Sequence, residues 1–248
     1  MSNKQQYELI KLKEVTSTQT YLIDKDDGLS LQEFTTVYTT NQTLGRGQGE
    51  HKWESEKDKN ISFSFVLRPI FLNPSNQYLI TKIISLAIAD VLQEYGIDDV
   101  KIKWPNDIYV KQNKICGILV QNKIIGNELS AVYVGIGINI NQKDFHLAPN
   151  PTSFLLEKGR GFDTTQVFNS CMQRIIHKYE DYRKGKLKDL DKEYLEKLLF
   201  FKEYHKYEYD NKVIDAKIID VNEFGHLILQ DKHATIYTAE LREIKFLL

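Results

Sequence analysis

A glycine-rich segment with two cations and one aromatic residue has the residue types needed to bind an anionic ligand. It spans residues 45–53 and reads GRGQGEHKW. Glycines let the backbone approach a ligand, Arg46 and Lys52 supply positive charge, and Trp53 offers a ring for stacking on a base. The third glycine comes one place too early for a dinucleotide fingerprint, and no Gly-Lys-Ser/Thr closes a Walker loop. The segment alone is equally consistent with a flexible, solvated loop.

A second segment places two polar side chains at the start of an apolar strand. Residues 101–110 read KIKWPNDIYV, so that Asn106 and Asp107 directly follow Pro105. Amide and carboxylate groups in this position could contact phosphates or a hard cation. Pro-Asn-Asp is also ordinary turn chemistry, and taken alone the segment is predicted to be a tight turn.

A third segment, residues 114–120, reads KICGILV and puts Lys114 at the mouth of a strongly apolar strand. Such a lysine could hold a carboxylate, with about 4 kcal/mol of Coulomb attraction at ~4 Å before desolvation is subtracted. A lone hairpin lysine more often faces solvent. A fourth segment, residues 134–141, reads VGIGININ, and bare glycines in a strand leave room for a flat ligand or another backbone.

Helices and strands are predicted around these segments. The clearest helix covers residues 75–95, where apolar residues recur at helical spacing, Ser75 is placed as N-cap and Gly96 as the C′ glycine. The glycine-rich segment itself is predicted to be a loop. The other predicted elements are a short helix capped by Ser17 and Thr18, helices over 165–184 and 190–201, and strands over 8–15, 34–40, 61–67, 100–104, 107–110, 115–121 and 130–134.

The chain changes character after Tyr204, where β-type runs alternate with turn residues and no helical pattern remains. This spacing suits a small β-barrel built from consecutive hairpins. We therefore predict an α+β main domain with a mixed or antiparallel sheet over residues 1–203 and a β module over 204–248.

Composition narrows the range of partners. The 248 residues carry 33 Lys+Arg against 34 Asp+Glu, so the excess of positive charge typical of nucleic-acid binding is missing. No apolar run reaches the ~20 residues of a membrane span, and the N-terminus shows no signal-peptide pattern. We expect a cytoplasmic protein with no nucleic-acid or membrane partner. Cys116 and Cys171 are predicted to be buried, reduced thiols.

Together, the four segments resemble those of biotin–protein ligases, also called biotin–[acetyl-CoA-carboxylase] ligases. The motifs GRGxxxxKW, KWPND, KxxGIL and GIGINI occur in the family's order, and residues 17–19, Ser-Thr-Gln, resemble its Ser-Thr-Asn. The resemblance runs over nearly the whole chain. It implies a class II synthetase-like catalytic domain followed by an SH3-like barrel.

The resemblance also implies a two-step reaction. The carboxylate of biotin attacks the α-phosphate of ATP, giving biotinyl-5′-AMP and pyrophosphate. The ε-amine of one lysine on a biotin carboxyl carrier domain then attacks the mixed anhydride and forms an amide. Biotin, ATP with Mg²⁺ and the carrier domain are the implied partners, and both monomers and homodimers fit the sequence.

The resemblance assigns a role to individual residues by motif match. Arg46 and Lys114 are implied as catalytic, Asp107 as a contact for Mg²⁺, and Trp53 as a shelter or stacking partner for adenine. The implied biotin-binding residues are Ser17, Thr18, Gln19, Gln42, Arg46, Gly47, Gln48, Lys114, Gly135 and Gly137. The implied ATP-binding residues are Lys52, Trp53, Asn106, Asp107 and Asn139.

Two positions depart from the family pattern. Many members have a second arginine where this chain has Gln48, which removes one charge-assisted contact to phosphate. We hypothesise that His51 and Lys52 compensate and that the loop still closes over the intermediate. Gln19 replaces asparagine, a conservative change.

Three alternatives compete with this interpretation. One is a lipoate-type ligase of the same fold, and another is a non-catalytic, biotin-responsive binding protein. A third is a repressor with an N-terminal helix-turn-helix, against which the Ser17-Thr18 motif stands too close to Met1. The acceptor protein and the order of the glycine-rich loop without ligand are not predicted.

Overall fold

A seven-stranded mixed sheet forms the centre of the computed structural model, which describes residues 7–49 and 51–247. Glu50 of the glycine-rich segment and the outer ends of the two predicted domains lie outside the described residues. Among the described strand pairs of this sheet, only β1–β2 is parallel. In spatial order the strands are β1 (Leu9–Lys11), β2 (Thr36–Thr39), β5 (Ile61–Leu67), β9 (Glu128–Ile138), β8 (Asn113–Ile125), β7 (Asp107–Val110) and β6 (Val100–Lys103).

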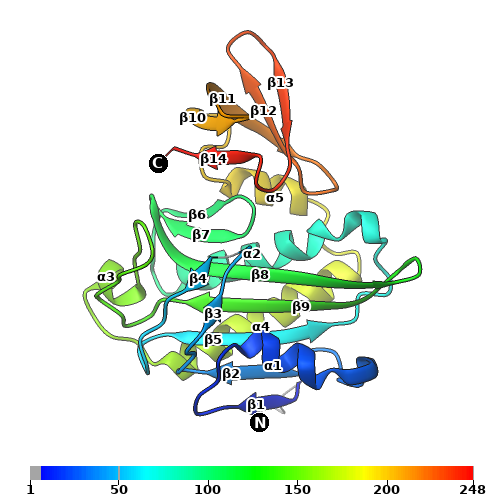
Figure 1. Cartoon of the computed structure of the whole chain (residues 1–248), viewed down its shortest axis with the longest axis vertical. Helices are drawn as coiled ribbons and strands as arrows, with labels where there is room; N and C mark the ends of the chain where they lie inside the picture. The colour runs from blue at the N-terminus through cyan, green and yellow to red at the C-terminus, as the bar shows by residue number, and fades with distance from the viewer. Residues whose placement is uncertain (1–6, 50, 248) are drawn as a thin grey trace.

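Helices cover the two faces of this sheet unequally. On one face, α2 (Tyr78–Glu94) and α4 (Thr164–Arg183) form a continuous layer, while on the other α1 (Thr18–Lys25) packs mainly on β2, β5 and β9 (Figure 1). Every residue of β5 is buried because that strand has helices on both faces, which explains its unbroken apolar and small-residue sequence. The half of the sheet near β8 and β7 is left open on the α1 side.

The glycine-rich segment lies over this open half and is not wholly a loop. Gly45–Arg46 (β3) pairs with Lys52–Trp53 (β4) in a two-stranded antiparallel hairpin. The expectation of a loop throughout was therefore wrong at its two ends. Glycine has poor intrinsic strand propensity, but pairing across the hairpin supplies backbone hydrogen bonds that overcome it.

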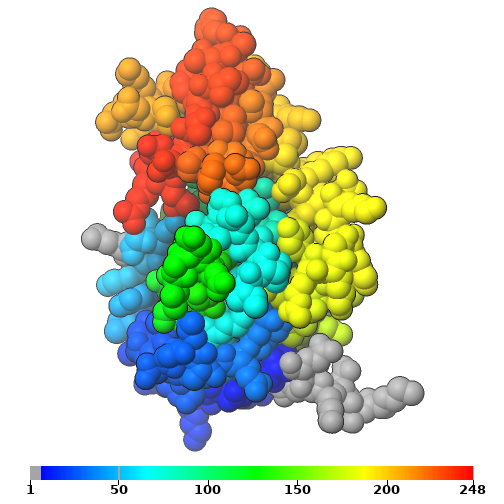
Figure 2. Space-filling view, turned by 90° about the vertical axis from the view of Figure 1, so that its right-hand side faces the viewer, coloured from blue at the N-terminus to red at the C-terminus, as the bar shows by residue number. Residues whose placement is uncertain are grey.

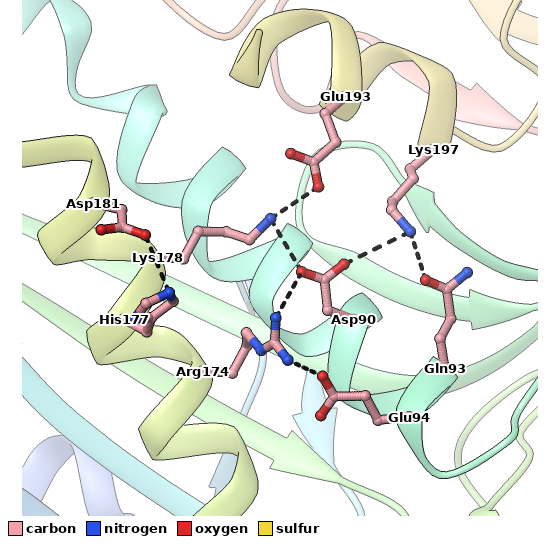
Figure 3. Close-up of polar contacts among 9 residues, drawn as sticks. All are labelled: Asp90, Gln93, Glu94, Arg174, His177, Lys178, Asp181, Glu193 and Lys197. Atoms are coloured by element: carbon pink, nitrogen blue, oxygen red, sulfur yellow. Dashed lines mark hydrogen bonds and ion pairs between the residues drawn. The ribbon is translucent and has the colours of Figure 1, made fainter. Parts of the chain in front are cut away.

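An ion-pair network ties α5 (Leu190–Lys197) to α2 and α4 (Figure 3). Asp90 of α2 lies 3.1 Å from the Lys178 ammonium and 3.9 Å from both Arg174 and Lys197. Lys178, which is 9% exposed, also pairs with Glu193 of α5 at 2.8 Å. A buried ammonium needs such partners, so the network fixes the helix that leads into the C-terminal strands.

The beginning of α2 differs from the prediction. Ser75 is not its N-cap; instead Asn73 caps a 3₁₀ turn, η2 (Pro74–Asn76), and accepts a hydrogen bond from the Ser75 amide at 3.0 Å. Pro74 suits the first position of such a turn because it has no amide hydrogen to satisfy. Gly96 has a φ of 77°, which confirms the predicted glycine beyond the C-terminus of the helix.

Strands β8 and β9 are longer than predicted and form one hairpin that turns at Gly126. The tip of this hairpin (green) reaches the surface below the C-terminal strands in Figure 2. Two further short elements, η1 (Asp27–Leu29) and α3 (Phe154–Lys158), were not predicted.

The C-terminal strands form a five-stranded antiparallel sheet beyond the β6 edge (Figure 1), which confirms the predicted small β architecture. The order is β13 (Ile236–Ala239), β12 (Leu227–Asp231), β11 (Lys212–Val221), β10 (Tyr204–Tyr209) and β14 (Ile244–Phe246). Its buried side chains belong to the same apolar cluster as those of the main sheet. The division of the chain into two domains at residue 203 stays a prediction.

Both cysteines are free and buried, as predicted, and burial raises the pKa of each thiol. Within residues 7–49 and 51–247, no helix has the length and apolar character to cross a bilayer.

Candidate active site

A cleft of about 1110 Å³ opens on the α1 side of the sheet, between the start of α1, the β3–β4 hairpin and the C-terminal sheet. All fifteen residues to which the sequence assigned a role line it. They are Ser17, Thr18, Gln19, Gln42, Arg46, Gly47, Gln48, Lys52, Trp53, Asn106, Asp107, Lys114, Gly135, Gly137 and Asn139. Residues as far apart in the sequence as Ser17 and Asn139 therefore meet at one cleft, although the role of each residue stays a prediction.

Buried hydroxyl and amide groups gather at the start of α1. Ser17 caps the helix by accepting a hydrogen bond from the Thr20 amide, and Thr18 donates from its backbone amide to Gln42 Oε1 at 2.9 Å. The Thr18 hydroxyl lies 2.8 Å from Ser64 Oγ, a residue that the sequence analysis missed. These fixed donors and acceptors suit a polar, uncharged head group, because each buried polar atom needs a partner.

The space left by the strand glycines holds two side chains of the protein itself. A Cβ on Gly135 would overlap the amide of Gln19, and a Cβ on Gly137 would overlap the indole of Trp53. Gly117, which pairs with Gly137 across β8 and β9, also faces this indole, with 3.1 Å between a Cβ there and the ring. The side chains of Gln19 and Trp53 thus occupy the space beside the glycines that were expected to flank a ligand.

Trp53 is half-buried, with the nitrogen of its indole turned away from solvent. Its Nε1 has no hydrogen-bond acceptor among the described residues. The Lys114 ammonium lies 5.5 Å from its ring centroid, within the range of a cation–π contact. Trp53 therefore fills the site with its apolar surface while its one polar atom remains unsatisfied.

A β-bulge sets the direction of Lys114. Cys116 pairs with Ile108, but Lys114 pairs with Tyr109, so Ile115 is the extra residue in β8. If the strand kept all its residues but had no bulge, Lys114 would pair with Val110 and face the core on the same side as Cys116. The bulge turns Lys114 to the cleft side instead.

On the cleft side, Lys114 forms an ion pair with Asp107. Its ammonium lies 2.8 Å from Asp107 Oδ2, and the two side chains are 25% and 21% exposed. The pair is accessible from the cleft, so an incoming carboxylate could compete with Asp107 for the lysine.

A second lysine, Lys103, lies deeper at the border with the C-terminal sheet. Its ammonium is 5.6 Å from the Tyr109 ring centroid and 4.9 Å from that of Phe246. Burial lowers the pKa of Lys103, which Asp107 opposes and Lys114 reinforces. The aromatic rings stabilise the charged form without supplying a hydrogen-bond acceptor.

The lining is cationic although the chain is nearly neutral. The lysines and arginines that line the cleft outnumber its Asp and Glu carboxylates two to one. These cations are Arg46, Lys52, Lys103, Lys114, Arg242 and Lys245, against Asp24, Glu54 and Asp107. Such an excess favours a ligand with several negative charges, because a low-dielectric cleft concentrates the field.

Two asparagines of the site support the backbone around it. Asn106 donates from its side chain to the carbonyl of Ile118, whose amide donates back to the Asn106 carbonyl at 3.1 Å. Asn139 donates to the carbonyl of Thr152 at 3.0 Å, and its own Oδ1 is buried with no donor in the described part of the chain.

Several lining residues were not found from the sequence. Lys103 stands in the KWPND segment but received no role, and Arg242, Lys245 and Phe246 come from the C-terminal sheet. Nothing local marks these last three, because only the packing of the two sheets brings them to the cleft. Over the described ranges, no group of three His, Cys, Asp or Glu side chains could hold a metal ion.

Comparison with known proteins agrees with this geometry. Residues 12–139 match the biotin/lipoate A/B protein ligase family, and the chain belongs to that family. Within it, the similar proteins are biotin–protein ligases, which confirms the resemblance drawn from the motifs.

The bifunctional ligase/repressor BirA of Bacillus subtilis is 32% identical over 155 residues, which are 60% of this chain and 47% of that protein. The chain thus spans about half the length of this relative. Biotin–protein ligase 1, chloroplastic, of Arabidopsis thaliana is 36% identical over 106 residues, or 42% of this chain and 29% of the other.

Among solved structures, the biotin protein ligase of Aquifex aeolicus in complex with biotin and ATP superposes with a TM-score of 0.78 at 25% identity, covering 96% of this chain and 97% of that one. This match confirms the predicted fold class.

Proposed function

We propose that the protein is an ATP-dependent biotin–protein ligase that forms biotinyl-5′-AMP and transfers biotin to a lysine of a biotin carboxyl carrier domain. The observation that carries this proposal is one cleft with two chemically different ends. Buried hydroxyl and amide groups at the start of α1 suit an uncharged ring, and the cations around Lys114 suit a carboxylate joined to phosphate. The similar biotin protein ligase of Aquifex aeolicus, solved in complex with biotin and ATP, supports the choice of these two substrates.

In the first step, the polar end would orient biotin. Ser17, Thr18 and Gln42 hydrogen-bond the ureido ring, while Lys114 releases Asp107 and pairs with the biotin carboxylate. Arg46 then stabilises the charge that develops between that carboxylate and the α-phosphate. Little covalent work falls to the protein, because positioning and fixed charge account for most of the acceleration in such reactions.

ATP would occupy the cationic end. Lys52, Asn106 and Asn139, which line the cleft, would contact the nucleotide, and Trp53 would cover the adenine once its indole has moved away from Gly117 and Gly137. Mg²⁺ would arrive with ATP and be held mainly by phosphate oxygens and water, with Asp107 as its carboxylate contact. In the second step, the acceptor amine attacks the anhydride carbonyl and AMP leaves.

The test is mass spectrometry of a purified biotin carboxyl carrier domain after incubation with the protein, biotin and MgATP. We expect a mass gain of one biotinyl group that requires all three components. A gain with lipoate or octanoate but not with biotin would establish the lipoate-type ligase. Absence of transfer, together with a rise in melting temperature on adding biotin, would establish a binding protein.

A further inference from the structure

Because position 48 is glutamine, the β3–β4 hairpin has one cation fewer than the family pattern. A guanidinium from another part of the chain lies beside this hairpin. A Cβ built on Gly49 would lie 3.6 Å from Nη2 of Arg242. Arg242 belongs to the turn between β13 and β14 of the C-terminal sheet. The positive charge therefore reaches the hairpin from the C-terminal sheet, which forms the opposite wall of the cleft.

Arg242 is available for a ligand. It is exposed, it lines the cleft, and in the described part of the chain it makes no hydrogen bond or ion pair. Lys245, the other cation of this wall, lies 3.7 Å from Glu208 and is thus partly neutralised. The backbone of Arg242 has a φ of 86°, a conformation that costs an ordinary residue free energy and is often found at ligand sites.

The wall that carries Arg242 is fixed to the catalytic sheet next to the KWPND segment. Trp104 Nε1 donates to the carbonyl of Gly225 at 2.9 Å, and Gly225 packs so closely on the Tyr78 ring that a Cβ would not fit. Phe246, at the other end of β14, covers the Lys103 ammonium. The turn before β14 is therefore held at the rim of the cleft.

We propose that Arg242 is a phosphate-binding residue of the active site and takes the place of the missing cation at position 48. This inference rests on the proposed function. Its planar guanidinium can donate two parallel hydrogen bonds to the phosphate of biotinyl-5′-AMP. His51 and Lys52 lie on the same hairpin as Gln48, whereas Arg242 faces them, so the phosphate is held from both walls.

The test measures how long the protein retains biotinyl-5′-AMP. We expect Arg242→Gln to release the adenylate about tenfold faster, the factor that corresponds to one hydrogen bond to a charged group. Its affinity for biotin in the absence of ATP should stay unchanged. Adding Gln48→Arg to this variant should restore retention, because it returns a guanidinium to the same phosphate from the hairpin.

Lys232→Gln provides the matched control. It removes one positive charge from the same C-terminal sheet, at an exposed lysine paired with Asp215 at 2.6 Å, and should retain adenylate as the wild type does. Equal retention in Arg242→Gln and the wild type would overturn the role of Arg242. So would a loss that Gln48→Arg does not restore. If the wild-type protein neither forms adenylate nor transfers biotin, the proposed function itself fails.

Discussion

Replacing Lys114 with methionine tests the centre of the site with little change in shape. The Lys114 stem lies beside Gly117, with 3.4 Å between Cε and a Cβ built there, and an unbranched methionine can occupy the same space. The ammonium is lost, and Asp107 is left without the ion partner that it has at 2.8 Å. A biotin carboxylate would then meet a negative charge where it now meets a pair of opposite charges.

The structure separates the effect on stability from the effect on activity. The two partners of the ion pair are 25% and 21% exposed, so screening by water limits its contribution to folding to about 1 kcal/mol. A charge that stabilises a developing oxyanion contributes more, and losing one such donor typically costs about 2.7–4 kcal/mol, or 10²–10³ in rate. We therefore expect adenylate formation to fall about a hundredfold or more while the free energy of unfolding falls by about 1 kcal/mol.

Adenylate formation is measured as single-turnover production of biotinyl-5′-AMP, and stability by urea unfolding at the same pH. Lys123→Met, on an exposed part of the same strand, is the control and should match the wild type in both. Adding Asp107→Asn to Lys114→Met removes the unpaired carboxylate, so it should recover stability without recovering the rate.

Two results would refute this reasoning. A rate loss below about tenfold would mean that Lys114 does not meet the reacting carboxylate. A loss of about 3–5 kcal/mol in stability would mean that the ion pair acts as a buried structural pair, and the rate could then not be interpreted.

Three further outcomes are expected. The fully buried Asp26 carboxylate pairs with Arg68 at 2.7 Å, so Asp26→Asn should lower the free energy of unfolding by about 3–5 kcal/mol in urea at neutral pH. Burial opposes ionisation of Asp26, but hydrogen bonds led by that from Arg68 outweigh it and lower the pKa of Asp26 below 3.8. The difference in free energy of unfolding between Asp26→Asn and the wild type should therefore shrink as the pH falls below that value. A difference that stays constant with pH would contradict the assignment. Gly137→Ala should displace the indole of Trp53 and increase quenching of its fluorescence by acrylamide; unchanged quenching would mean that the methyl group is accommodated in another way. Asp90→Asn should cost about 1–2 kcal/mol, measured by thermal unfolding with unchanged adenylate formation, and equal stability would show that the three helices need no ion pairs.

Much of the fold was accessible from the sequence because its buried faces follow apolar patterns that are continuous in a strand or periodic in a helix. The strand over 61–67 and the two long helices follow such patterns, whereas β8 and β9 extend into polar residues that only their mutual pairing orders. The N-cap at Asn73 was missed because Ser75 is also a good capping residue. The β3–β4 hairpin required a tertiary pairing that its glycines do not indicate.

The site was predictable as a set of positions but not as an arrangement. The motifs named fifteen residues that the structure brings to one cleft, but they could not show that Trp53 and Gln19 fill the glycine positions. The contribution of Arg242 was also inaccessible, because no local pattern links the end of the chain to the hairpin near residue 48.

The bulge at Ile115 determines the spacing at which Lys114 and Gly117 can face the same side of the strand. In a regular strand, residues three positions apart point to opposite faces, so a lysine and a glycine at this spacing serve one ligand only if an extra residue lies between them. Forcing the same residues into a regular strand would turn Lys114 to the core side, whereas deleting Ile115 would leave Lys114 opposite Tyr109 and two positions from Gly117, on the same face. In redesign or in divergence of this strand, a change that removes the bulge while keeping all its residues therefore redirects Lys114, but loss of the bulged residue itself does not.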